Sequence, residues 1–98
     1  MSDPGPSHWT FLSNHAHVLV LLDADPGLRV RDLADAIGIT ERAAQRILAD
    51  LEREGYLDRT RAGRRTHYEV HLERPMRHPV EAHAVVGRVV AALRQPND

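Results

Sequence analysis

In residues 33–57, LADAIGITERAAQRILADLEREGYL, two short amphipathic segments flank a Gly-Ile-Thr connection. Gly38 ends the first segment, because glycine readily adopts the left-handed conformation that closes a helix. Thr40 precedes the second segment, where a threonine side chain can cap the first turn. Residues 31–37 and 41–54 are therefore predicted to be two helices joined by a tight turn.

The second predicted helix has an apolar face and a polar face. Ala43, Ile47 and Leu51 recur at every fourth position and would hold the helix against a core. The major groove of B-form DNA admits one helix, whose N-terminal turns reach the base edges. The candidate DNA-binding residues of these turns are Thr40, Glu41, Arg42, Gln45 and Arg46.

These side chains differ in what they offer to DNA. Arginine bonds guanine in a bidentate way, and glutamine bonds adenine similarly. Thr40 can donate to a phosphate once its capping role allows. Glu41 either accepts a hydrogen bond from a cytosine amino group or favours the positive end of the helix; we favour the second interpretation.

Residues 58–70, DRTRAGRRTHYEV, follow this helix and alternate about a turn at Gly63. The alternation predicts a β-hairpin with strands over residues 56–61 and 65–70. The whole chain has a net charge of -1, but residues 59–79 hold six arginines and two acidic residues, a net +4. The predicted phosphate contacts of this hairpin are Arg59, Arg61, Arg64, Arg65 and His67.

Two helices, a tight turn and a basic hairpin occur in the order of a winged helix-turn-helix. Residues 28–71 resemble the core of the MarR-type and ArsR-type regulators of bacteria and archaea. The resemblance lies in LADAIGIT (33–40), ERAAQRILADLEREGYL (41–57) and DRTRAGRRTHYEV (58–70). It implies a homodimer that binds a pseudo-palindromic operator in double-stranded DNA, with the hairpin on phosphate or the minor groove. No small-molecule effector is assigned.

The flanking segments are predicted to supply further helices. Residues 14–24 form an apolar helix that ends at an Asp-Pro-Gly turn, residues 28–30 are a candidate short strand, and residues 80–94 form a valine-rich helix. A chain of 98 residues has too little interior to cover both apolar helices, so a second subunit should bury one surface. The candidate dimer-interface residues are Trp9, Phe11, Val85, Val86, Val89 and Leu93.

Several classes of function are disfavoured. The chain has no cysteine, no glycine-rich phosphate loop and no serine in a nucleophile elbow, so we expect no enzyme and no cofactor. Seven histidines are present, but none of their spacings gives a closed zinc site from one segment, and carboxylates or a second subunit would have to help. We therefore assign no metal ligand. We also expect no contact with a membrane and a cytoplasmic location.

The sequence thus predicts an α+β, mainly helical winged helix-turn-helix with an additional C-terminal dimerisation helix. Residues 1–8 are expected to be a disordered N-terminal tail, and residues 9–98 a single domain. Within it lie the helix-turn-helix (31–54), the wing (56–71) and the C-terminal helix (80–94). Two alternatives to DNA binding remain: a winged helix that binds proteins, and a sensor of metal or pH that uses the histidines.

Overall fold

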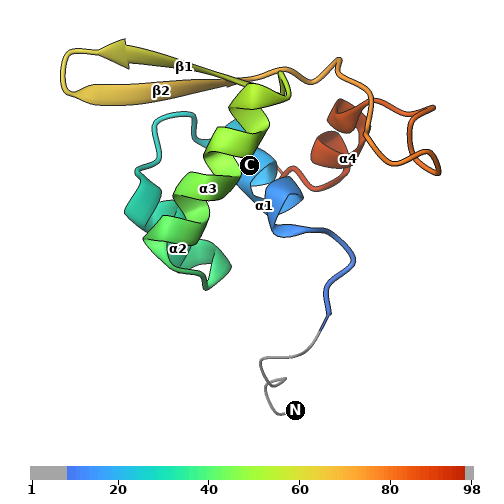
Figure 1. Ribbon diagram of the computed structural model, residues 1–98, viewed down its shortest axis with the longest axis horizontal. Helices are drawn as coiled ribbons and strands as arrows, with labels where there is room; N and C mark the ends of the chain where they lie inside the picture. Colours follow the sequence, from blue (N-terminus) through green and yellow to red (C-terminus); the bar gives the residue numbers. More distant parts are fainter. Residues whose placement is uncertain (1–8, 97–98) are drawn as a thin grey trace.

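A computed structural model describes residues 9–96, and the predicted tail, residues 1–8, lies outside them. The described part of the chain forms a winged helix-turn-helix in which α1 lies between α3 and α4 (Figure 1). The elements are α1 (Asn14–Ala24), α2 (Val30–Ile37), α3 (Glu41–Arg53), β1 (Leu57–Ala62), β2 (Arg65–Val70) and α4 (Val86–Ala92). Between residues 9 and 96, no helix is long and apolar enough to span a membrane.

Local capping explains where the helices begin and end. The Ser13 hydroxyl accepts a hydrogen bond from the backbone N–H of Ala16 at 3.2 Å and caps α1. Gly38 closes α2 with a φ of 87°, a conformation that glycine adopts without strain. The Thr40 hydroxyl then accepts from the N–H of Ala43 at 3.0 Å and starts α3. The predicted helix-turn-helix is confirmed.

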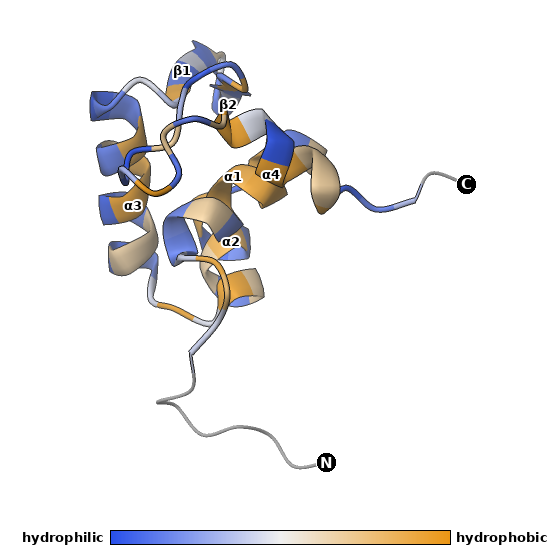
Figure 2. Ribbon diagram, turned by 90° about the vertical axis from the view of Figure 1, so that its right-hand side faces the viewer, coloured by the Kyte–Doolittle hydropathy of each residue, from blue (hydrophilic) through white to orange (hydrophobic). Residues whose placement is uncertain are grey.

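The core collects one apolar face from each helix and the base of the hairpin. Its largest fully buried side chains are Val18, Leu22, Leu33, Leu57 and Val90. The helix α3 buries Ala44, Ile47, Leu48 and Leu51, while Ala43 is only half-buried. Figure 2 shows the result: the apolar parts of the helices face inward, and the outer side of α3 is hydrophilic. The polar face of α3 is therefore left to solvent.

The strands β1 and β2 form the predicted antiparallel wing, which spans residues 57–70 in the structure and 56–71 in the prediction. Ala62 pairs with Arg65, which leaves a two-residue turn in which Gly63 has a φ of 63°. The expected short strand over residues 28–30 is wrong, because Val30 already belongs to α2. Instead the carbonyl of Pro26 accepts a hydrogen bond from the N–H of Tyr68 at 3.0 Å. This bond ties β2 to the turn before α2.

The prediction of one continuous helix over residues 80–94 is also wrong, since α4 comprises only Val86–Ala92. The backbone before α4 folds back on itself: the N–H of Met76 donates to the carbonyl of Ala84 at 2.9 Å. Val85 is extended, with φ of -87° and ψ of 153°. Long-range backbone bonds have replaced the helical ones, which a valine-rich pattern cannot reveal.

The short α4 is fixed to its own chain at both ends. A Cβ on Gly87 would lie 2.7 Å from the carbonyl oxygen of Leu72, so glycine permits this close approach. Beyond the helix, the Arg94 guanidinium donates to both carboxylate oxygens of Asp23 at 2.9 and 3.0 Å. These hydrogen bonds lower the pKa of Asp23 below its usual value. The helix α4 is therefore packed against the core of its own chain, and only part of it is exposed on the surface.

Candidate nucleic-acid interface

The exposed face of α3 begins at its N-terminal cap. Every predicted DNA-binding residue of this region is exposed: Thr40, Glu41, Arg42, Gln45 and Arg46. Ala44, Ile47 and Leu48 bury the opposite face. The side chains that can bond base edges thus extend away from the core over the first turns of the helix, as a major-groove helix requires.

Thr40 is the structural member of this group, because its hydroxyl accepts the N–H of Ala43. Replacing Thr40 by alanine removes the cap, and the free energy of unfolding should fall by about 1 kcal/mol. Urea unfolding measures this value. Thr40→Ser keeps the hydroxyl and is the control. Equal stability of the alanine variant and the wild type would contradict the capping role.

The wing residues predicted to contact phosphate are Arg59, Arg61, Arg64, Arg65 and His67, and all of them are exposed. The hairpin register distributes them over two faces, because residues directly opposite each other share a face. Arg59 pairs with Tyr68, which is buried, so Arg59 lies on the inner face. Its Nε is 3.7 Å from a carboxylate oxygen of Glu52 on α3. Arg65 and His67 alternate to the other face.

A hollow of about 280 Å³ lies between the wing and the residues just before α2. Four arginines line it: Arg29, Arg59, Arg64 and Arg65. The Arg65 guanidinium also donates to the carbonyl of Gly27 at 3.1 Å, which fixes the wing against this turn. Arginines gathered beside one hollow favour an anionic oxygen ligand such as phosphate.

Sequence reasoning missed Arg29. The surrounding residues 29–38 contain two arginines and two acidic residues, so this segment shows no positive charge along the chain. The signal is spatial, because the backbone bond from Tyr68 to Pro26 draws the segment before α2 to the arginines of the wing. Arg29 therefore joins the candidate interface.

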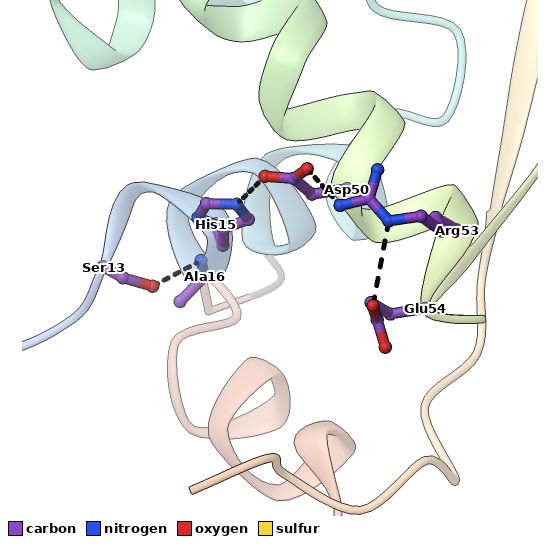
Figure 3. Close-up of polar contacts among 6 residues, drawn as sticks. All are labelled: Ser13, His15, Ala16, Asp50, Arg53 and Glu54. Carbon is purple, nitrogen blue, oxygen red and sulfur yellow. Dashed lines mark hydrogen bonds and ion pairs between the residues drawn. The ribbon is translucent and has the colours of Figure 1, made fainter.

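A polar network holds α3 against α1 away from the candidate interface (Figure 3). His15 Nε2 lies 2.9 Å from one carboxylate oxygen of Asp50, and Arg53 donates to the other at 2.6 Å. The hydrogen bonds from His15 and then Arg53 lower the pKa of Asp50. Residues near the C-terminal end of α3 therefore orient the helix, and those near its N-terminal end are left for a ligand.

The residues predicted for a dimer interface divide into two groups. Val86 is buried in the core of its own chain, so that residue is corrected to a core residue. Trp9 and Phe11 are 75% and 91% exposed, and their rings pack edge to face at 5.0 Å. Phe11 and the half-buried Val89 line one hollow of about 370 Å³. Val85 and Leu93 are exposed as well.

The chain is similar to transcriptional regulators of known structure. The PcaV transcriptional regulator from Streptomyces coelicolor is 31% identical, with a TM-score of 0.52 over 60% of this chain and 46% of that chain. The AntR antimony-specific transcriptional repressor is 27% identical, with a TM-score of 0.52 over 79% of this chain and 60% of that chain. This chain thus spans about half the length of these regulators.

A riboflavin kinase from Thermococcus kodakarensis is 42% identical over 43 residues, which are 44% of this chain and 20% of the kinase. The sequence model of the MarR family matches residues 10–65, which include all of α1, α2, α3 and β1. This match covers more than half of the chain, and it includes the helix-turn-helix described above. The chain therefore belongs to the MarR family of winged-helix proteins.

Proposed function

We propose that this chain is a sequence-specific transcriptional regulator that inserts α3 into the major groove of double-stranded DNA. The observation that carries the proposal is the division of α3 into a buried apolar face and exposed polar N-terminal turns. The similarity of this chain to two transcriptional regulators of known structure supports the proposal. As a regulator that binds DNA, it would act in the cytoplasm.

In this proposal, α3 and the wing have different tasks. Arg42, Gln45 and Arg46 bond base edges and supply sequence preference. Thr40 and Glu41 start the helix and approach the backbone. The wing residues Arg59, Arg61, Arg64, Arg65 and His67, together with Arg29, neutralise phosphates, so they supply affinity for any duplex.

An enzymatic function has much less support. The kinase match covers only 20% of that enzyme, so the shared 43 residues are too short to carry its reaction. A winged helix that binds another protein is the second candidate, although it does not require four arginines around one hollow. A salt titration separates DNA binding from protein binding, because only DNA releases condensed counterions on association.

The wing proposal predicts a change in salt dependence. Replacing Arg64 and Arg65 together by alanine should weaken binding to all duplexes about equally and lower the slope of log K against log salt by about one to two units. Fluorescence anisotropy at several salt concentrations measures this slope. The control is Arg77→Ala, which removes an exposed arginine outside the wing. An unchanged slope in a folded double variant would exclude the wing from the interface.

We further propose that the protein is a homodimer. The apolar side chains that form the proposed surface are those of Trp9, Phe11, Val85, Val89 and Leu93. Phe11 and Val89 line a common hollow, and Leu93 lines a second hollow with Val20 and Leu21. Exposed apolar groups of this size favour burial by a partner. A second copy fits because two-fold symmetry would present two copies of α3 to the DNA.

A further inference from the structure

A cluster of metal-ligating side chains lies at the base of the wing. Asp58 on β1, Glu69 on β2 and His71 just after β2 each direct one ligand atom into a region where these atoms lie within 4.8 Å of one another. His71 Nε2 is 2.9 Å from a carboxylate oxygen of Asp58. None of these residues belongs to the proposed DNA-contacting set.

The two carboxylates of this cluster lie opposite each other on the two strands of the wing. Asp58 and Glu69 are direct partners in the hairpin register. Like charges directly opposite each other on neighbouring strands are destabilising. A divalent cation between the two carboxylates would convert this repulsion into attraction, and an imidazole on the same side adds a nitrogen ligand.

His71 is fixed at the base of the wing through its backbone. Its backbone N–H donates to the carbonyl of Tyr56 at 2.9 Å, and its side chain is 24% exposed. The second ring nitrogen, Nδ1, lies 3.8 Å from a carboxylate oxygen of Glu73. Histidine ligands commonly have a carboxylate beside the nitrogen that does not bind the metal, which fixes the orientation of the ring. At 3.8 Å the Glu73 carboxylate is too far away for this hydrogen bond, so the exposed side chain would take this role only after rotating toward the ring.

We propose that Asp58, Glu69 and His71 bind one divalent transition-metal ion, for which Zn²⁺ is the appropriate probe. One nitrogen and two carboxylate oxygens suit Zn²⁺, whereas Mg²⁺ and Ca²⁺ prefer oxygen ligands alone. Zn²⁺ bonds of about 2.0–2.2 Å place tetrahedral ligand atoms about 3.4 Å apart. The exposed Asp58 and Glu69 side chains reach this spacing by rotation, and water completes the coordination.

Binding at this place would link the two strands where the wing leaves the core. It would also neutralise the two carboxylates nearest the wing arginines along the chain. Because it removes negative charge beside the wing, metal binding should also increase the affinity for DNA, and this effect rests on the proposed function. Metal binding itself does not depend on that function, so it is measured without DNA.

Isothermal titration of the full chain, free of any histidine tag, with ZnCl₂ tests the site. One ion should bind per chain. His71→Gln and Asp58→Asn should each weaken binding by more than about tenfold, because even outer-shell partners contribute about that much. His83→Gln, an exposed histidine outside the cluster, is the matched control and should bind as the wild type does.

Glu69→Gln keeps the shape of an exposed side chain, so it tests the site even if the His71 variant fails to fold. Circular dichroism establishes folding of each variant. Zinc should also perturb the imidazole proton resonances of His71 before those of other histidines. Equal affinity of Glu69→Gln, Asp58→Asn and His83→Gln, or several ions per chain with no dependence on the cluster, would overturn the proposal.

Discussion

Replacing Arg42 and Arg46 together by alanine is expected to weaken binding to the preferred DNA site by about 2–4 kcal/mol, because each base-reading side chain contributes about 1–3 kcal/mol. Both residues are exposed on α3, so the loss should come from the contact and not from unfolding. The two positions are one helical turn apart, so their contributions need not add.

The informative quantity is the ratio of affinities for the preferred duplex and a scrambled duplex. Anisotropy titrations at one salt concentration should show this ratio falling sharply in the double variant. The wing variant of Arg64 and Arg65 is the matched comparison, because it removes the same charge but should leave the ratio nearly unchanged. If the α3 variant kept the wild-type ratio, α3 would not read the bases.

Phe11→Glu is expected to produce monomers and to reduce operator affinity by about 10²–10⁴-fold. Its ring is 91% exposed in a single chain, so the substitution costs the monomer little, but it would place an unpaired carboxylate in a dimer interface. The loss in DNA affinity follows because a dimer gains its second half-site contact intramolecularly. Val89→Glu should act in the same direction.

Sedimentation equilibrium measures this effect, and Val80→Glu is the control. Val80 is an apolar residue with 74% exposure, and it is not among the residues assigned to the interface. The wild type and the Val80 variant should have twice the chain mass of 11.0 kDa, and the Phe11 variant should have that mass once. A wild type of 11.0 kDa with full DNA affinity would exclude the dimer.

Local signals in the sequence were sufficient for the helix-turn-helix and the wing. Gly38 and Thr40 mark the turn because each position has a specific backbone or capping requirement. The alternation about Gly63 similarly predicts the hairpin. The exposed polar face of α3 follows from helical periodicity, which is also local.

The remaining features depend on contacts between distant residues. Residues 80–85 are apolar enough for a helix. Instead, the backbone N–H of Met76 donates a hydrogen bond to the carbonyl of Ala84 across the loop, and Val85 is extended. Arg29 joins the arginines of the wing only because the hairpin folds back onto the turn before α2.

The cluster at the base of the wing is another such feature. The spacing of His71 along the sequence did not indicate a metal site, because Asp58 becomes its neighbour only when β1 and β2 pair. In each of these cases the sequence supplied the residue types, and the backbone pairing brought them together.

Sequence-specific binding by α3 can be tested by letting the full chain select duplexes from a random pool and sequencing the bound ones. We expect enrichment of a pseudo-palindrome whose half-sites are about 10–10.5 base pairs apart, because two copies of α3 would lie about 34 Å from each other. We also expect the Arg42 and Arg46 double variant to lose this enrichment while still binding DNA. A pool that remains random after selection by the wild type would contradict sequence-specific binding by this chain.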